Sequence, residues 1–438
     1  MLQSLIIFAL LFQLFFIISI VKDDKLNNIF KLSLICYVIF WIFAPGITAL
    51  ILDVLNQDSV KLLHKDFCIY YISEFLILYF SVQIIKLLSK KSDKINEYKF
   101  SDSLIYKVIF SLLIILIFNY YTTPKLSYIE NNTIDGASNN LLTPITSIFK
   151  TFFFSFLIFV SCITTKKKIF WLSLFAVLIT VSFMMISGAR ISISAIFFII
   201  LYRIIFISSS KVKLLFNLFL TAVFISILVM PILIGIEKAR SDDLNISEIS
   251  NNLDTKSVIS VFTSVFQKFN SIDAGIKLVN GYGSGVAGLK PYIGSVFIFV
   301  PQYFYPKKPI SGSIDNTYFG TPARLVVQYD NPDDLAGNVG VAPLAVTIWQ
   351  FGWIIGPLSL FIFTTFNLFF LNFLMNSNRP IINAIGTYFL PLPGFIGIFS
   401  SPDVYLKNTV YLIFFIIIVF FFNIIYKQVI LEVKKIKS

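Results

Sequence analysis

Histidine, cysteine and charged side chains are all scarce in this chain. It has one histidine and three cysteines among 438 residues, and charged residues make up 13% of the total. Because His64 is alone and lies in a connector, we expect neither a histidine-based metal site nor a Ser-His-Asp triad. Cys36, Cys68 and Cys162 all lie in apolar runs, so we expect small buried side chains there, with no disulfide and no zinc site.

The scarcity of charge accompanies an excess of apolar residues. Hydrophobic residues make up 57% of the chain, and the mean hydropathy is +0.84. A soluble domain carries far more charge, so this composition is typical of a polytopic membrane protein. Backbone polar groups inside a bilayer must pair within their own segment, which favours helices. The sequence therefore predicts an all-α fold.

Apolar runs long enough to cross a bilayer occur along most of the chain. A helix needs about 20 apolar residues to span the hydrocarbon core, and by this measure we predict about eleven spans, within a range of about ten to twelve. About eight lie in residues 1–236 and about three in residues 341–438, ahead of a basic tail. The predicted spans are residues 2–20, 29–51, 67–88, 104–121, 147–165, 169–187, 191–208, 214–236, 343–374, 381–400 and 409–426.

One polar interruption separates the two groups of spans. Residues 237–340 contain charges, glycines and prolines in place of apolar runs. Within this loop, apolar residues recur at helical spacing from Val258 to Ile276, which predicts an amphipathic helix. The apolar stretch Tyr292–Phe304 is too short to cross, so it predicts an interfacial or re-entrant helix. A chain that keeps one large polar loop beside so many spans is expected to act at that loop.

Lysines are concentrated in alternate connectors, which predicts the orientation of the chain. Cytoplasmic connectors of membrane proteins carry an excess of lysine and arginine. By this rule we expect the loop 237–340 to lie outside and the C-terminal tail to be cytoplasmic. Met1–Ile20 has no basic residue ahead of its apolar stretch, so we expect an uncleaved first span in place of a signal peptide. The net charge of +12 is carried by these connectors, so no nucleic-acid partner is expected. The lysine-rich connectors contain Lys22 and Lys25, then Lys90, Lys91, Lys94 and Lys99, then Lys166, Lys167 and Lys168, and then Lys211 and Lys213.

Three of the five arginines run against this lysine pattern. Arg190, Arg240 and Arg324 fall on the predicted outer side. Arginine offers a rigid fork of donors that fits a phosphate group and does not lose its charge. Arg190 opens a predicted helix, where free backbone N–H groups favour an anion, although a charge that only marks the membrane edge is the alternative. Arg240 could instead be a snorkelling residue at a helix end, and Arg324 a solvated loop charge. The functional alternative is that these arginines bind a lipid-linked phosphate or diphosphate.

Glu74, Asp242, Lys307 and Lys308 are the other charged candidates. Glu74 lies inside an apolar run, about 10 Å below the predicted outer surface at 1.5 Å per residue. An ionisable group at that depth is costly, so it is either functional or hydrogen-bonded within the bundle. Glu74 or Asp242 could accept a proton in catalysis. Lys307 and Lys308 could hold a headgroup phosphate or simply anchor a helix end at the interface.

Nucleotide and metal motifs are absent from the sequence. It contains no glycine-rich phosphate loop, no paired-aspartate nucleotide-sugar motif and no cluster of metal ligands. If the chain is an enzyme, its donor is therefore expected to be already activated and lipid-linked. A diphosphate leaving group would then drive the reaction with neither metal nor cofactor.

The topology and three local sequences together resemble the bacterial O-antigen polymerases, the Wzy-type polymerases of oligosaccharide repeat units. The predicted spans and the large loop cover most of the chain. The local sequences are Ser187-Gly-Ala-Arg190, Phe299-Val-Pro-Gln-Tyr-Phe-Tyr-Pro-Lys-Lys-Pro309, and Gly337-Asn-Val-Gly340 followed by Trp349-Gln-Phe-Gly352 and Gly356. Some members have a glycine eleven positions after a loop arginine. That motif is absent here, because the residues eleven positions after Arg190, Arg240 and Arg324 are Leu201, Asn251 and Leu335.

This resemblance implies a metal-independent glycosyltransferase of the bacterial inner membrane, acting in lipopolysaccharide or similar polysaccharide biosynthesis. It would move a growing glycan from undecaprenyl diphosphate onto the non-reducing end of a new lipid-linked repeat unit at the periplasmic face. Arg190 and Arg240 would stabilise the departing diphosphate, and Arg324 would bind diphosphate or sugar. The lipid-linked oligosaccharide, the bilayer and a chain-length regulator protein are the implied partners. The aromatic residues expected to stack on sugar faces are Tyr303, Tyr305 and Tyr318.

Other functions remain open from the sequence. A flippase or transporter for the same lipid-linked unit would need two pseudo-symmetric halves around a central cavity, and the single large loop disfavours it. An O-antigen ligase relies on a histidine in a periplasmic loop, whereas His64 lies in a different connector. A non-catalytic assembly or receptor protein would use the loop as a binding surface.

The substitution Arg190→Lys tests the assignment of the arginines. Lysine keeps the charge but lacks the planar fork that binds a diphosphate through two bonds. We expect the variant to make markedly shorter glycan chains, visible in the banding of the surface polysaccharide on gels. Wild-type chain length at a matched protein level would count against Arg190.

Overall fold

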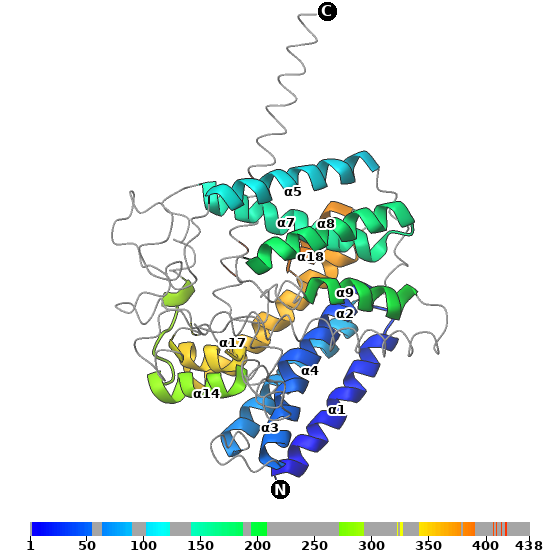
Figure 1. Ribbon diagram of the computed structural model, residues 1–438. Helices are drawn as coiled ribbons and strands as arrows, with labels where there is room; N and C mark the ends of the chain where they lie inside the picture. Colours follow the sequence, from blue (N-terminus) through cyan, green and yellow to red (C-terminus); the bar gives the residue numbers. More distant parts are fainter. Residues whose placement is uncertain are drawn as a thin grey trace, which may run out of the picture.

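The computed structural model describes residues 2–54, 64–89, 102–122, 142–186, 194–207, 271–292, 341–377 and 380–389, with isolated positions within 322–326 and 406–417. The regular structure in these ranges is helical, and none of it is a strand (Figure 1). The predicted all-α class is therefore confirmed for this part of the chain.

The first helices run up and down beside one another. The group consists of α1 (Leu2–Lys22), α2 (Asn28–Tyr37), the π-helix η1 (Val38–Phe43), α3 (Ala44–Val54) and α4 (Lys65–Leu88). α1 packs against α2, α3 and α4. Gln3, at the start of α1, donates a 2.6 Å hydrogen bond to Asp53 at the end of α3, so these two helices are antiparallel.

The predicted span 29–51 contains a change of helical geometry. It is divided into α2, η1 and α3, and Pro45 lies in the first turn of α3. Proline has no N–H, and its ring clashes with the carbonyl four residues earlier in a regular α-helix. The wider turns of η1, directly before Pro45, accommodate that clash.

α7 is the centre of a second group of helices. The group consists of α5 (Asp102–Thr122), α7 (Leu142–Ile163), α8 (Lys167–Ile186), α9 (Ser194–Tyr202), the π-helix η4 (Arg203–Ile207) and α18 (Pro380–Phe389). α7 packs against α5, α8, α9 and α18. The Arg203 guanidinium donates to the carbonyl oxygens of Ser161 and Thr164 at 3.1 and 3.0 Å, which pairs carbonyl groups at the end of α7. It also lies over the Phe170 ring, 4.1 Å from the ring centroid.

α17 (Pro343–Met375) is a helix folded back on itself. Gly352 interrupts it with φ 85° and ψ 176°, a backbone conformation that is essentially restricted to glycine. A Cβ atom on Gly356 would lie 2.8 Å from the Cα of Ile348, so the two halves approach closely on either side of the break. The second half, from Trp353 to Met375, is about 34 Å long at 1.5 Å per residue, which is enough to cross the hydrocarbon core.

The first half of α17 is enclosed by its neighbours. Every residue from Pro343 to Gln350 is buried. α14 (Ser271–Tyr282) packs along it, and the absence of a side chain at Gly275 lets Ala345 approach. Backbone N–H groups of residues 285–288 donate to the carbonyl oxygens of residues 348–350 over 2.9–3.4 Å. These bonds pair the last carbonyl groups before the break at Gly352.

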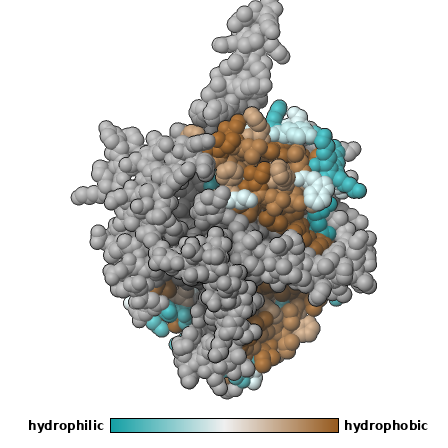
Figure 2. Space-filling model, viewed as in Figure 1, coloured by the Kyte–Doolittle hydropathy of each residue, from teal (hydrophilic) through white to brown (hydrophobic). Residues whose placement is uncertain are grey.

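Much of the exposed surface is apolar. Three helices among the described residues, α1, α4 and α17, are long and apolar enough to cross a membrane. Figure 2 shows apolar side chains gathered over α5 and α8, where Phe110, Trp171 and Phe175 are 66, 64 and 61% exposed. Exposed apolar surface of this extent is typical of a protein that faces lipid. The helices therefore support the predicted association with a membrane.

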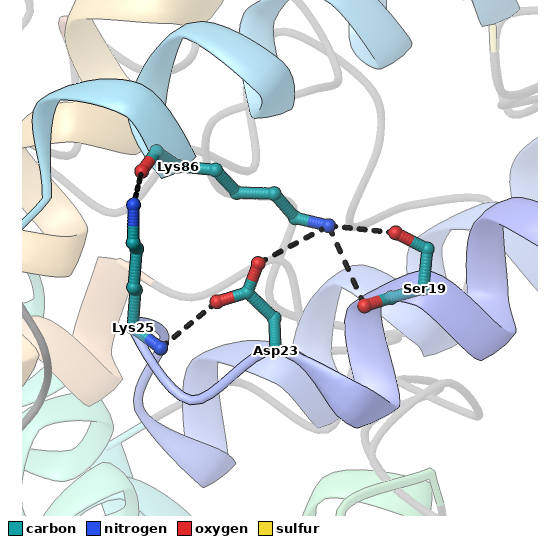
Figure 3. Close-up of polar contacts among 4 residues, drawn as sticks. All are labelled: Ser19, Asp23, Lys25 and Lys86. Atoms are coloured by element: carbon teal, nitrogen blue, oxygen red, sulfur yellow. Dashed lines mark hydrogen bonds and ion pairs between the residues drawn. The ribbon is translucent and has the colours of Figure 1, made fainter.

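Polar contacts join the ends of α1 and α4 on one side of the bundle (Figure 3). Lys86 Nζ lies 3.3 Å from Asp23 Oδ2 and donates to Ser19 Oγ over 2.8 Å. Lys25 Nζ donates to the Lys86 carbonyl oxygen over 2.9 Å. These ends therefore lie together. That this side faces the cytoplasm stays a prediction from the lysine pattern.

The helix boundaries agree with the predicted spans within about five residues wherever both are described. In the predicted loop, α14 covers the C-terminal part of the expected amphipathic helix. Outside the described residues lie the predicted span 214–236, most of the span 409–426, the end of the span 381–400, and most of the loop 237–340. The count of about eleven spans and the division of the chain at residues 236 and 340 therefore stay predictions.

The substitution Gly352→Ala tests the break in α17. Alanine cannot adopt this backbone conformation without strain, which costs on the order of 1–3 kcal/mol. We expect a lower midpoint of thermal unfolding for the purified protein in detergent. Gly281→Ala, at an exposed helical position in α14, is the matched control and should be neutral or slightly stabilising. Equal midpoints for the two variants would contradict the break.

Candidate functional site

The candidate site centres on Glu74, in the middle of α4. Its side chain is buried, with 5% exposure. The Tyr37 hydroxyl, at the end of α2, donates a 3.2 Å hydrogen bond to Glu74 Oε1. Within the described part of the chain, Glu74 Oε2 has no hydrogen-bond partner. Buried polar atoms are nearly always paired, so a half-paired carboxylate inside the bundle marks a candidate functional group.

A cavity of about 10 Å³, roughly the size of one water, lies beside this carboxylate. Its lining residues come from three parts of the fold: the end of α2, the middle of α4 and both halves of α17. They are Tyr37, Glu74, Ile77, Leu78, Pro343, Leu360 and Thr364. Pro343 is the first residue of α17 and follows closely on the predicted loop 237–340. The carboxylate therefore lies close to the point where that loop returns to the bundle.

Two other buried polar side chains of α4, Tyr71 and Ser81, are paired, in contrast to Glu74. The Tyr71 hydroxyl and the Gln13 amide exchange hydrogen bonds of 2.9 and 3.1 Å. Gly46 leaves room for this pair, because a Cβ atom there would overlap the Tyr71 hydroxyl. Ser81 Oγ accepts a 2.9 Å hydrogen bond from Thr365 Oγ1. The hydroxyl groups of Tyr71 and Ser81 thus have partners on neighbouring helices, whereas Glu74 Oε2 on the same helix has none among the described residues.

The described part of the predicted loop packs against the first half of α17. The Tyr282 hydroxyl donates to the Leu325 carbonyl oxygen over 2.9 Å, and burial raises the pKa of this phenol, which favours the neutral donor. Tyr292 stacks on Phe351, and its hydroxyl lies 3.3 Å from Gln350 Oε1. These contacts hold the loop segment against the buried helix whose first residue lines the Glu74 cavity.

Of the residues predicted to form the site, the structure describes only Glu74. The others lie outside the described residues: Arg190, Arg240, Asp242, Tyr303, Tyr305, Lys307, Lys308, Tyr318 and Arg324. Whether the three arginines share one cavity therefore stays open to experiment. The described arginine, Arg203, has the structural role at the end of α7 given above.

Sequence reasoning missed Tyr37, Thr364 and Pro343 as neighbours of Glu74. Tyr37 is a polar side chain within an apolar run, and Thr364 belongs to the polar group Thr364, Thr365 and Asn367 within another, and those exceptions to the pattern were the available signal. Pro343 carried none, because its position beside Glu74 depends on the fold-back of α17 at Gly352. Within the described ranges, His, Cys, Asp and Glu side chains nowhere form a group of three that could hold a metal ion.

Comparison with known proteins gives no relative. No family model, no curated protein and no solved structure matches the chain. The site must therefore be interpreted from its own residues and from the sequence resemblance described above.

The substitution Glu74→Met tests whether Glu74 is kept for function or for stability. Methionine fills a similar volume and removes an unpaired buried oxygen, a group that typically costs about 1–3 kcal/mol. It is combined with Tyr37→Phe, because the Tyr37 hydroxyl would otherwise lose its acceptor. We expect the double variant to unfold at a higher temperature than the wild type, as measured on purified protein in detergent. A residue kept for structure would give the opposite result, a clear loss of thermal stability.

Proposed function

We propose that this protein polymerises undecaprenyl-diphosphate-linked oligosaccharide repeat units into O-antigen or a similar surface polysaccharide. The reaction would take place at the periplasmic face of the bacterial inner membrane. The observation that carries the proposal is the half-paired carboxylate of Glu74, in a cavity that Pro343 lines where the predicted loop 237–340 returns to the bundle. The apolar helices and the local sequences that resemble O-antigen polymerases support it.

The proposed reaction is a transfer of the growing glycan between two lipid carriers. The acceptor hydroxyl oxygen forms a bond to the anomeric carbon of the donor sugar. The bond from that carbon to the diphosphate oxygen breaks, and its electron pair leaves with undecaprenyl diphosphate. The hydroxyl proton must go to a base, and a carboxylate with an available oxygen is suited to accept it. We assign this role to Glu74 Oε2, which is buried and has no hydrogen-bond partner among the described residues, and the proton would reach it through the water-sized cavity beside it.

The charge that grows on the departing diphosphate needs a cationic partner. Arg190 and Arg240 are proposed for that role, and Arg324 for diphosphate or sugar, because fixed guanidinium groups stabilise such charge more in the transition state than in the ground state. Lys307 and Lys308 would hold a headgroup phosphate. No nucleotide or metal is required, since the diphosphate already activates the donor.

A flippase for the same lipid-linked unit is the principal alternative. Buried polar side chains in the middle of the bundle, such as Asn367 at 0% exposure, are what a carrier would also contain. A flippase and a polymerase differ in what accumulates when the gene is lost. Without the polymerase, single repeat units still reach the lipopolysaccharide core, whereas without a flippase or a ligase none do.

The decisive experiment is gene deletion followed by complementation. We expect the deletion strain to carry single repeat units on the lipopolysaccharide core, and the wild-type gene to restore long chains. A Glu74→Gln gene should fail to restore them, because removing a general base slows a reaction by about 10²–10⁴-fold. Chain length would be measured by gel electrophoresis and mass spectrometry.

Ser81→Ala is the matched control for Glu74→Gln. Ser81 is also on α4 and fully buried, but its hydroxyl is paired with Thr365, and it lies about 10 Å along the helix from Glu74. It should restore wild-type chain length. Loss of all repeat units on deletion would refute the polymerase, and full activity of Glu74→Gln would refute the assigned base.

A further inference from the structure

Two buried polar side chains one helical turn from the Glu74 cavity are also unpaired. Within the described residues, Ser33 Oγ on α2 and both side-chain polar atoms of Asn367 on α17 have no hydrogen-bond partner. Both side chains are 0% exposed. Each unpaired buried polar atom costs about 1–3 kcal/mol. Three helices therefore each contribute a side chain with at least one unpaired polar atom to the interior of the bundle: Ser33, Glu74 and Asn367.

Helix geometry places these side chains on the faces that line the cavity. Ser33 precedes Tyr37 by four residues, and Asn367 follows Thr364 by three, so each lies on the same helix face as a cavity-lining residue. The face of α2 that carries Ser33 and the face of α17 that carries Asn367 are therefore both directed toward the region next to Glu74.

The level of the side chains along the bundle agrees with this placement. Asn27 Nδ2, at the start of α2, donates to the Met375 carbonyl oxygen, at the end of α17, over 2.9 Å, so the two helices run antiparallel. From that contact, Ser33 lies about 9 Å up α2 and Asn367 about 12 Å up α17, at 1.5 Å per residue. By the same count, Tyr37 lies about 15 Å along α2 and Thr364 about 17 Å along α17 from that contact. Both residues line the one cavity, which supports this alignment of the two helices.

We propose that internal water binds here, bridging the Glu74 carboxylate to the Asn367 amide and the Ser33 hydroxyl. A buried polar site that offers several hydrogen-bonding partners is where ordered water is found in proteins, and the cavity beside Glu74 has about the volume that one water needs. The amide and hydroxyl both donate and accept, so they can complete the bonds that bridging water leaves open. The site extends from the cavity toward the end of the bundle where Asn27 meets Met375.

In the proposed polymerase, on which this step rests, the water has a defined role. Glu74 accepts the proton of the acceptor hydroxyl and must release it before the next transfer. Bound water next to Oε2 takes that proton from the carboxyl group and transfers it through the bridging water to bulk solvent, which returns Glu74 to the carboxylate. A dry apolar cavity would provide no acceptor at that atom.

Hydroxyl-radical footprinting of the full-length protein in lipid nanodiscs tests the site directly. X-ray radiolysis converts bound water into radicals that oxidise the side chains beside it, even when those side chains are buried. We expect oxidation at Leu78 and Leu360, which line the cavity and are 2 and 4% exposed. Leu157 and Ile158, both 0% exposed on α7 in the other group of helices, are the matched controls and should stay unmodified. Oxidation of Leu360 no greater than that of Leu157 would overturn the proposal.

Two variants separate bound water from general loosening of the bundle. Asn367→Leu removes the bridging amide, and we expect oxidation of Leu360 to fall to the level of Leu157. Thr365→Val removes a hydroxyl that is already paired with Ser81, so the labelling should remain as in the wild type. Unchanged labelling in Asn367→Leu would show that Asn367 does not hold the water and would refute the extended site.

The outcome is independent of the proposed function. If the labelling follows these expectations but the Glu74→Gln variant still polymerises, the water site is supported and its role in polymerisation is refuted. If the labelling is absent but the Glu74→Gln variant is inactive, the water site is refuted and Glu74 keeps its proposed role as base.

Discussion

Leaving a buried polar group unpaired is costly in an apolar helix bundle, and the need to pair such groups organises much of the described structure. The Tyr71–Gln13 and Ser81–Thr365 pairs satisfy it between helices, and the loop amides of residues 285–288 satisfy it for the carbonyl groups next to the break in α17. Glu74 satisfies it only in part, since one oxygen has the Tyr37 hydroxyl and the other has no partner among the described residues. A carboxylate is the most costly side chain to leave in that condition, so its retention indicates a use other than stability.

Charged groups at the ends of the helices show how the same chain treats charges that serve the fold. Lys86 is almost buried, yet it has a carboxylate, a hydroxyl and a carbonyl oxygen within reach. Arg203 lies against two carbonyl oxygens and an aromatic ring. Both groups lie at helix ends, where unpaired carbonyl groups favour cations. Lys86 and Arg203 each have several partners, whereas Glu74 is only half paired, and this contrast separates structural charge from candidate functional charge within a single fold.

The sequence was sufficient for those features that depend on composition. Helices and their approximate ends follow from the length of each apolar run, and Glu74 stood out because a charge interrupts such a run. Hydropathy could not reveal the break at Gly352, because the residues on both sides of it are equally apolar. The neighbours of Glu74 were also beyond reach, since Tyr37, Pro343 and Thr364 come together only when α2 and the two halves of α17 pack on α4. The arginines illustrate a third case, in which a pattern of charge suggests a site whose geometry depends on residues outside the described ranges.

The fold-back of α17 has a mechanical consequence. Gly275, Ala345 and Gly356 are small at the places where α14, the first half of α17 and the second half meet, so the three backbones are in close contact with little side-chain cushioning between them. Closely packed backbones transmit displacement with little loss, because interiors of this density are hard to compress. A ligand that pushed on the segment of residues 271–292 would therefore shift Pro343 and, with it, one wall around Glu74. Ligand binding at this segment and the reactivity of the Glu74 carboxylate would then both depend on the position of the first half of α17.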